Sequence, residues 1–462
     1  MCGIAGTFNL NADVEAGTYA LRHRGPDAQN VISEGRLILG HVRLSIIDPK
    51  SRSDQPFRYG DVLLAYNGEI WNYSEIKNRL IKLGKKFKTT GDTEVVAAAL
   101  NEWGDNAFNY FRGMFTMVWS ADDGKTINIA RDPFGEIPIH IIFINGGIAF
   151  ASEIKALTAM GIPPFAAEFV QPGTIITASQ NGIMRKVYYE IPVQESVDGP
   201  REAAIHLKEL MQSAVKERRI SDVPICALIS GGIDSSTILH FLSNVRPDIV
   251  VYTAIYDEKS SDLKRAREMA EAAEVELREV KVRPPTADEL AEVVRIIEMP
   301  HKAQVEIGWP CLKLAEVMRG DGFKVTFSGE GSDELWASYG FAYHALKTQN
   351  WRLYRKNLFM QQHRKNFARC NKIFMSRSVE CRLPFLHVPL VEYAISLSRE
   401  AVECPKQKGV LREAMRGLLP DSIIERQKVA FQDGMGIKKA ISRAVRDPRR
   451  FYGSEFRKSI AD

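Results

Sequence analysis

A cysteine stands directly after the initiator methionine and before a small glycine, in the opening segment MCGIAG. Removal of Met1 would make Cys2 the amino-terminal residue. A free α-amine has a pKa of about 7.7 to 8.0, so it could act as a general base for the thiol of the same residue. Cys2 is therefore a candidate nucleophile that requires no histidine, although a second-position cysteine can also be accidental.

A second candidate site follows the apolar run 225–229, where the sequence reads SGGIDSS. Glycines there allow backbone N–H groups to face an anion, the start of the following helix adds positive potential, and the serines add donors. No lysine follows the glycines, so the segment is not a Walker loop. The segment predicts a phosphate-binding loop formed by Ser230, Gly231, Gly232, Asp234, Ser235 and Ser236.

The elements that must position these residues differ between the two halves of the chain. The first 190 residues are mostly short β-branched and aromatic runs, with helical patterns at 73–82 and 93–103, which is typical of antiparallel α+β structure. From residue 201 onward strands alternate with helices, which indicates a parallel sheet, and from Asp333 the pattern is mostly helical. We expect two domains, 1–192 and 201–462, with a linker at 193–200.

Composition excludes several classes of protein. The 462 residues are 45% hydrophobic and 26% charged, as in a soluble globular protein. No apolar run in the sequence approaches the roughly 18 residues of a membrane span, and no signal peptide is evident. The six cysteines lack zinc-knuckle spacing, so we expect reduced thiols in the cytoplasm. A net charge of +5 is too weak to imply nucleic acid by itself.

Six segments of the first half carry a family resemblance. In order they are MCGIAG, RHRGPD, HVRLSIID, YNGEIWNY, GDTEV and RDPFG. Together they resemble the class II glutamine amidotransferase domain over about residues 2 to 190. The resemblance implies that an amino-terminal cysteine hydrolyses glutamine to glutamate and ammonia. It also implies an Ntn-hydrolase sandwich, with two antiparallel sheets between layers of helices (α/β/β/α).

The same resemblance assigns roles to residues around the cysteine. Asn67 and the backbone N–H of Gly68 would stabilise the oxyanion, as acyl transfer requires. Arg43 and Asp92 would bind the carboxylate and the ammonium of glutamine, with Glu69 beside them. For Arg43 the alternative is a surface ion pair. Four further polar residues of the motifs are expected to shape loops only: Arg24, Asp27, Arg131 and Asp132.

SGGIDSS resembles the loop of the ATP pyrophosphatase superfamily, whose members split ATP into AMP and pyrophosphate. Asp234 is then a magnesium ligand, because Mg²⁺ prefers one or two carboxylates together with phosphate oxygens. A second loop, SGEGSDE, begins at Ser328 and Gly329, which we assign to ATP. In it Asp333 would be the second magnesium ligand, and Glu330 would handle the acceptor or transfer a proton. This loop also fits a helix cap at Ser332, and the two roles are compatible.

The order of motifs, continued by ECRLPFL at 380–386 and RQKVAFQDGMG at 426–436, is similar to that of the glutamine-hydrolysing asparagine synthetases. The family implies that ATP activates aspartate as its β-aspartyl adenylate and that ammonia travels inside the protein to displace AMP. It places Lys428 near the adenylate phosphate, where an ordinary exposed lysine is the alternative. It also implies bound Mg²⁺, an α/β adenylating domain with a helical C-terminal part, and a homodimer.

Some residues depart from the family pattern. Asn371 and His387 stand where the family usually has aspartates, and the paired glycines after SGEGSDE are absent. These changes leave open a different acceptor carboxylate, or a binding or regulatory protein with impaired synthetase chemistry. Between Leu335 and Val379 there are nine Lys or Arg residues and no Asp or Glu. That segment fits a helical surface or, as the alternative, contact with a phosphate-rich or nucleic-acid-borne acceptor.

Overall fold

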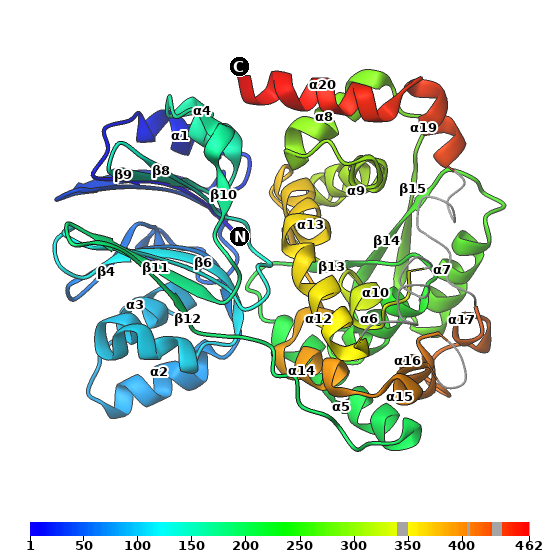
Figure 1. The fold of residues 1–462 in the computed structure, drawn as a ribbon. Coiled ribbons are helices and arrows are strands. Elements are labelled where there is room, and N and C mark those ends of the chain that lie inside the picture. Colours follow the sequence, from blue (N-terminus) through cyan, green and yellow to red (C-terminus); the bar gives the residue numbers. More distant parts are fainter. Residues whose placement is uncertain (340–349, 404–406, 427–436, 462) are drawn as a thin grey trace.

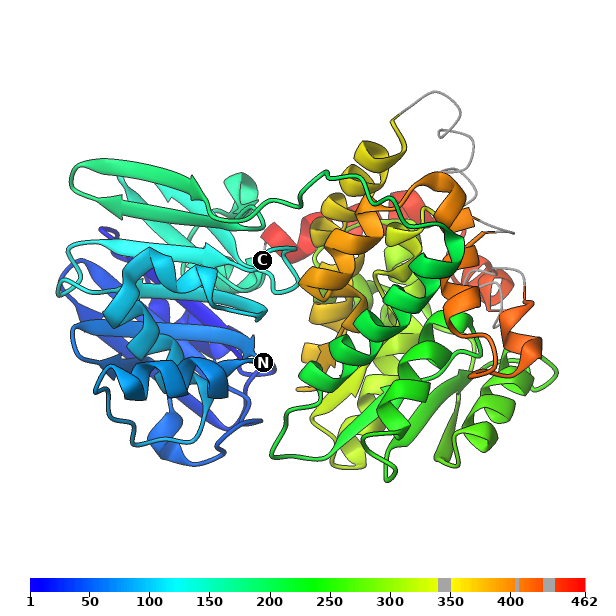
Figure 2. The ribbon, with the colours of Figure 1, turned by 90° about the horizontal axis from the view of Figure 1, so that it is seen from below.

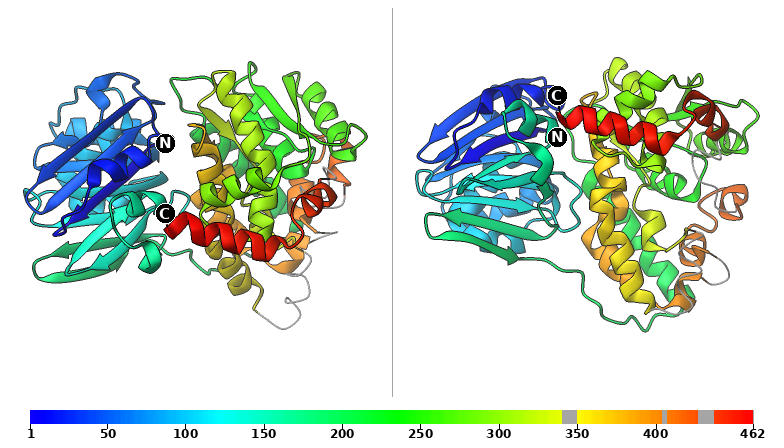
Figure 3. Two further views of the ribbon diagram at one scale, coloured as in Figure 1. Left: turned by 90° about the horizontal axis from the view of Figure 1, so that it is seen from above. Right: turned by 45° about the horizontal axis from the view of Figure 1, so that its top comes forward.

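The computed structural model describes residues 1–339, 350–403, 407–426 and 437–461. Two domains lie side by side, one built by the first part of the chain and the other by the rest (Figure 1). The N-terminus lies between them. The last helix, α20 (Pro448–Ala461), runs back so that its end lies beside α4 (Ile154–Ala159) of the first domain (Figure 3).

Two six-stranded antiparallel sheets face each other in the first domain. One sheet has the order β10-β8-β9-β1-β3-β2 and the other β12-β11-β7-β6-β5-β4. The strands of the first sheet are β1 (Gly3–Phe8), β2 (Ala28–Glu34), β3 (Leu37–Arg43), β8 (His140–Ile144), β9 (Gly147–Ala151) and β10 (Glu168–Phe169). Those of the second are β4 (Phe57–Tyr59), β5 (Val62–Ile70), β6 (Gly113–Ser120), β7 (Ile127–Arg131), β11 (Thr174–Ser179) and β12 (Gly182–Val187).

Helices cover the outer face of each sheet. α1 (Val14–Ala20) and α4 lie on the first sheet, and α2 (Tyr73–Lys82) and α3 (Asp92–Trp103) on the second (Figure 1). Figure 2 shows the molecule from the side that carries α2 and α3. The side chains of β5 explain why this domain has four layers, two of sheet and two of helices. Leu63 and Ala65 pack between the sheets, whereas Val62, Leu64 and Tyr66 pack under the helices. Because both faces of this strand are buried, its first five residues, Val62 to Tyr66, form a continuous apolar run.

The second domain is built on a parallel sheet of order β15-β14-β13-β16-β17. Its strands are β13 (Ile225–Leu228), β14 (Val250–Ile255), β15 (Glu276–Lys281), β16 (Val325–Phe327) and β17 (Glu380–Arg382). The helices along and between them are α5 (Pro200–Arg218), α6 (Ile233–Ser243), α7 (Ser261–Ala272), α8 (Ala287–Ile297) and α9 (Lys302–Gly320). Consecutive parallel strands need such crossover helices.

Short helices complete the C-terminal part. They are α10 (Ser332–Leu335), α12 (Trp351–Met360), α13 (Asn366–Met375), α14 (Val388–Ser396), α15 (Arg399–Glu403), α16 (Gly409–Ala414), α17 (Asp421–Ile424) and α19 (Lys438–Ala444). Every residue of α13 is buried, because this helix lies between the parallel sheet and the first domain (Figure 1).

The predicted fold class is confirmed, with an antiparallel α/β/β/α sandwich followed by a parallel-sheet domain and a helical end. Six strands were not expected from the sequence: β1, β2, β4, β10, β12 and the three-residue β17. β12 ends at Val187 and α5 begins at Pro200, and the domain limits stay a prediction. Among the described helices, none has the length and apolarity to cross a membrane.

Candidate active sites

Cys2 lies at the start of β1, with only 7% of its surface exposed. Its backbone is held on both sides, because its N–H donates to Asn67 Oδ1 at 2.7 Å and its carbonyl accepts from Arg24 Nε at 2.9 Å. Burial raises the pKa of the Cys2 thiol, while the ammonium of Met1 and a hydrogen bond from the Leu44 backbone act in the opposite direction. The thiol is thus held in a fixed position inside the domain.

Asn67 and Gly68, the expected oxyanion donors, follow on β5. Since Asn67 Oδ1 accepts from Cys2, the Nδ2 atom of the same amide is directed elsewhere, and it is buried with no hydrogen-bond partner in the described part of the chain. Gly68 has φ = +150°, and a Cβ there would lie 2.0 Å from the Met114 carbonyl oxygen, so no other residue fits. A buried unpartnered donor is costly. Its presence beside a nucleophile is what an oxyanion site requires.

Buried carboxylates surround the same site. Asp92 Oδ2 accepts from the Tyr66 hydroxyl at 2.8 Å and from the Ile70 N–H at 3.1 Å, and burial raises the pKa of Asp92. Burial, with Glu380 and Asp92 nearby, raises the pKa of Glu69 well above its usual range. Among the residues that the structure describes, Glu69 Oε2 has no hydrogen-bond partner, and Glu69 Oε1 lies 3.8 Å from Arg382 Nη2. This cluster can receive the ammonium of an amino acid.

Arg43 is buried, so it is not the surface ion pair considered as the alternative. Its guanidinium donates to Asp54 and to the carbonyls of Lys50 and Asp48, at 2.6 to 2.8 Å. These contacts shape the loop after β3. A role in binding the glutamine carboxylate stays a prediction.

In the second domain the predicted phosphate loop joins β13 to α6. Ser230 Oγ lies 3.1 Å from Ser235 Oγ, and the Ser230 N–H donates to the same Ser235 hydroxyl. Gly231 has φ = +68°, and a Cβ there would lie 2.5 Å from the Asp262 carbonyl oxygen. Gly232 caps α6, and Ser236 is buried in its first turn. The loop therefore stands at the carboxyl end of a central parallel strand, where α/β proteins bind ligands.

The two expected magnesium ligands lie close together, and a lysine bridges them. Lys408 Nζ lies 2.7 Å from Asp234 Oδ2 and 2.6 Å from Asp333 Oδ1, and Ser332 Oγ donates to Asp234 Oδ1 at 2.7 Å. Because the two carboxylates are close enough to share one ammonium group, they are also close enough to bind one divalent cation. The described residues place no group of three or more His, Cys, Asp or Glu side chains for a metal. Phosphate oxygens and water would therefore complete the coordination of Mg²⁺.

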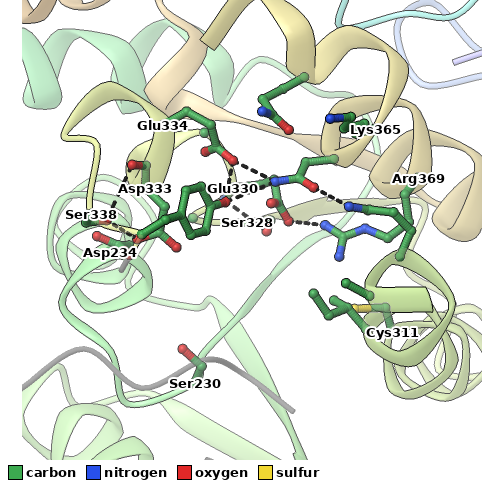
Figure 4. Close-up of a pocket in the computed structure, with 18 of the residues that line it drawn as sticks. Ser230, Asp234, Cys311, Ser328, Glu330, Asp333, Glu334, Ser338, Lys365 and Arg369 are labelled. Atoms are coloured by element: carbon green, nitrogen blue, oxygen red, sulfur yellow. Dashed lines mark hydrogen bonds and ion pairs between the residues drawn. The ribbon is translucent and has the colours of Figure 1, made fainter. Parts of the chain in front are cut away.

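A cavity of about 1020 Å³ joins this cation site to the predicted acceptor residue. Glu330 pairs with Arg369 from α13 (Figure 4). Next to them Glu334 Oε1 accepts from the Tyr339 hydroxyl at 2.5 Å and from Asn366 Nδ2 at 2.6 Å. Burial, together with Glu330 and Asp333, raises the pKa of Glu334 to about 7. Ser328 and Gly329 also line this cavity, as expected for a nucleotide contact.

Several of these residues were not predicted from the sequence. Lys408, Asn366 and Tyr339 belong to no recognised motif, and the contact of Lys408 with Asp234 spans 174 positions. Leu44 could have been suggested, because it follows Arg43 within HVRLSIID. Lys428 lies outside the described residues.

Several basic residues in the described part of the segment between Leu335 and Val379 are held by the protein, although Arg364 and Lys365 are exposed. Arg355 is buried and donates to four backbone carbonyls. Lys372 pairs with Glu298, and Arg377 with Glu292 and Glu316. These pairings favour the interpretation of a structural helical region over a nucleic-acid surface.

Comparison with known proteins agrees with this arrangement. A family model described as "Glutamine amidotransferase domain" matches residues 1–189, and one described as "Asparagine synthase" matches 206–368 and 349–450. The glutamine-hydrolysing asparagine synthetase of Zea mays is 31% identical over 90% of this chain and 74% of its own length. That of Asparagus officinalis is 29% identical over 94% of this chain and 78% of its own length.

Solved structures also match. The allosteric regulatory enzyme of purine biosynthesis is 17% identical over 63% of this chain and 77% of its own, with a TM-score of 0.36. Fold, sites and family models together define a glutamine amidotransferase domain joined to an amide-forming synthetase domain. The chain belongs to the family of glutamine-hydrolysing asparagine synthetases. It is a ligase, and its reaction is a glutamine-dependent amidation.

Proposed function

We propose that this enzyme converts aspartate to asparagine, with glutamine as the nitrogen donor and with ATP cleaved to AMP and pyrophosphate. The first domain releases ammonia from glutamine. The second activates the acceptor as an acyl-adenylate, because a carboxylate is a poor electrophile and AMP is a good leaving group. Assembly as a homodimer and a cytoplasmic location remain predictions of the family resemblance.

The observation that carries the proposal is the pairing of Cys2 with Asn67. The α-amine that removal of Met1 would free takes the proton of the Cys2 thiol, and the thiolate would attack the side-chain carbonyl of glutamine. Transfer of that proton to the amide nitrogen would expel ammonia and leave a thioester, from which water would then release glutamate. Asn67 Nδ2, which has no hydrogen-bond partner among the described residues, is available to the developing oxyanion. Asp92 and Glu69 would hold the ammonium of glutamine, and Arg43 its carboxylate.

In the second domain each residue has a proposed role in binding or orienting the nucleotide or Mg²⁺. Asp234 and Asp333 would hold Mg²⁺, which supplies charge stabilisation at the phosphates. The loop from Ser230 to Ser236, with Ser328 and Gly329, would hold the nucleotide. Lys408 would keep the two carboxylates paired before a cation arrives.

The position of the unusual residues supports aspartate as the acceptor. Asn371 contacts Arg24 and Met1 at the domain interface, and His387 lies 3.3 Å from Glu217. Neither is among the described residues that line the cavity. Ser338 does line it, and its hydroxyl donates to Asp333 Oδ1 at 2.6 Å. The departures at 371 and 387 therefore lie outside the described lining of the cavity, which is compatible with aspartate as the acceptor.

The test compares two nitrogen sources in Cys2→Ala. We expect this variant to release no pyrophosphate with glutamine and aspartate beyond the aspartate-only background, and to retain synthesis with added ammonium salts. Cys226→Ala, which alters a buried cysteine of β13, serves as the matched control and should use both sources. Equal loss with both sources would contradict the division of labour. A wild-type enzyme that releases no pyrophosphate with any carboxylate would support the binding-protein alternative instead.

A further inference from the structure

A buried arginine connects Cys2 to the second domain. Arg24 is fully buried, and its guanidinium makes three contacts. Nε donates to the Cys2 carbonyl at 2.9 Å, Nη1 to Glu153 at 2.7 Å, and Nη2 to Asn371 Oδ1 at 2.9 Å. The first two partners belong to the amidotransferase domain and the third to α13. The orientation of Arg24, and with it the backbone of Cys2, is thus set partly by the synthetase domain.

α13 reaches the synthetase cavity with its opposite side. Asn366 and Arg369, three residues apart and therefore on one face of the helix, line the cavity, and Arg369 pairs with Glu330. Asn371 is two positions after Arg369 and so points away from it. The helix is short and fully buried, which favours movement as a rigid unit. A displacement of Arg369 would therefore also displace Asn371.

A second contact of α13 leads to the same place in the amidotransferase domain. Lys372 Nζ pairs with Glu298 at 2.5 Å, and Glu298 accepts from the backbone N–H groups of Ile154 and Lys155 at 2.9 and 2.8 Å. Ile154 follows Glu153, the partner of Arg24. Five side chains thus connect the two domains: Arg24, Glu153, Glu298, Asn371 and Lys372. Since all five side chains are buried, none of these contacts is weakened by solvent.

One donor at the cavity end of α13 is without a partner. Arg369 Nη1 is buried, and no hydrogen bond to it is found among the described residues. A carboxylate that enters the cavity would be attracted to this donor and would compete with Glu330 for the guanidinium. Acceptor binding therefore has a direct physical effect on the residue that begins the path to Cys2.

We propose that Arg24 and Asn371 are positioning residues that couple glutamine hydrolysis at Cys2 to acceptor binding at Arg369. The inference rests on the proposed function and deepens it. Asn371, where the family usually has aspartate, supplies one accepting oxygen to Arg24. An aspartate there would supply the same oxygen, whereas alanine supplies none. The hydrogen bond from Arg24 to residue 371, and not the charge of residue 371, is the essential feature.

The experiment measures glutamate formed per pyrophosphate released, with ATP, Mg²⁺, aspartate and glutamine, and separately the rate with ammonium salts. Couplings of this kind change equilibria by several-fold, so we expect Asn371→Ala to raise the glutamate-to-pyrophosphate ratio about fivefold. The rate with ammonium should stay within about twofold of wild type, because Asn371 does not line the cavity. Asn371→Asp should keep the wild-type ratio. Ser376→Ala, at the C-cap of α13, removes a hydroxyl that donates to the Ile373 carbonyl and accepts from Arg377, and is the matched control.

Asn371→Leu provides a second variant that preserves volume, in case alanine leaves a cavity that unfolds the protein. An unchanged ratio in a folded Asn371→Ala or Asn371→Leu enzyme would overturn the coupling role. Equal loss of glutamine-dependent and ammonium-dependent synthesis would also overturn it, since that result indicates a structural role alone. Failure of the proposed function looks different, because the wild-type enzyme itself would then release no pyrophosphate with aspartate.

Discussion

The two active sites treat their charged and polar groups in opposite ways. Around Cys2, Asn67 Nδ2 and Glu69 Oε2 are buried with no hydrogen-bond partner among the described residues, and Glu69 Oε1 lies 3.8 Å from Arg382 Nη2. Across the synthetase cavity, three carboxylates are paired with cations of the protein, whereas Glu334 accepts from Tyr339 and Asn366. Lys408 lies between Asp234 and Asp333, and Arg369 pairs with Glu330.

This difference indicates two ways of preparing a site. The glutaminase site keeps Asn67 Nδ2 and Glu69 Oε2 fixed and unused, so a substrate gains these two groups without displacing a partner, whereas Arg43 and Asp92 already have partners. The synthetase site must exchange ion pairs when nucleotide, cation and acceptor enter, because its charges are neutralised in their absence. Preorganisation is therefore greater in the first domain, and rearrangement on binding is greater in the second.

The largest effect is expected from Asp234→Asn, which breaks the charge balance of the second site. Loss of one cation-binding carboxylate should lower ATP-dependent pyrophosphate release about a thousandfold. Glutamine hydrolysis should continue, because Cys2 and its neighbours are untouched. Parallel assays of glutamate and pyrophosphate check this result. A loss of glutaminase activity as large as the loss of pyrophosphate release would show that the two active sites do not act independently.

Asn67→Ala removes the donor that the first site holds ready. Glutamine hydrolysis should slow by a factor of about 100 to 1,000, as for other oxyanion donors, with little change in ammonium-dependent synthesis. Steady-state kinetics with both nitrogen sources measure the two effects. Asn72→Ala, which removes a contact to the Tyr110 carbonyl, is the matched control. Near-normal glutaminase turnover in Asn67→Ala would refute the oxyanion role.

Lys408→Met tests whether the ammonium of Lys408 and Mg²⁺ bind the same two carboxylates in the synthetase domain. Without the ammonium, the carboxylates of Asp234 and Asp333 lose the cation that they share, which should destabilise the fold by about 3 kcal/mol. Mg²⁺ binding to the same carboxylates should restore part of this loss, so Mg²⁺ should raise the Tm of the variant more than that of wild type. Thermal unfolding at several Mg²⁺ concentrations measures this difference. Equal Mg²⁺ responses would mean that the carboxylates do not bind the cation.

The smallest effect concerns Glu136, a buried carboxyl at the domain interface 3.7 Å from Arg218. Burial raises the pKa of Glu136 to about 8, above its unfolded value, so its contribution to stability is present at low pH and is lost as the pH rises toward 8. Between pH 6 and 8 the wild type should lose about 2 kcal/mol relative to Glu136→Gln. Denaturant unfolding at both pH values tests this. A difference that is independent of pH would contradict the raised pKa.

The sequence predicted most of the fold because its signals were local. The run around β5, the alternation of strands and helices after residue 201, and the glycine loop before α6 each follow from neighbouring residues. β17 was missed, since three residues are too few to show a strand pattern.

The site was predicted where motifs carried it and missed where contacts join distant positions. Cys2, Asn67 and Asp92 stand within motifs. The contact of Lys408 with Asp234, and that of Asn371 with Arg24 across 347 positions, leave no periodicity or spacing to detect. Arg24 was expected to shape a loop only, and its bond to α13 became visible only when the two domains were placed together.

The transfer of nitrogen from Cys2 to the synthetase cavity can be measured directly with glutamine carrying ¹⁵N in its side-chain amide. The wild-type enzyme would be given this glutamine with aspartate, ATP and Mg²⁺, in the presence of excess unlabelled ammonium. We predict that the new asparagine amide retains ¹⁵N well above the fraction in bulk ammonia, in step with pyrophosphate release. An amide with the isotope composition of bulk ammonia, or no labelled asparagine at all, would contradict the account.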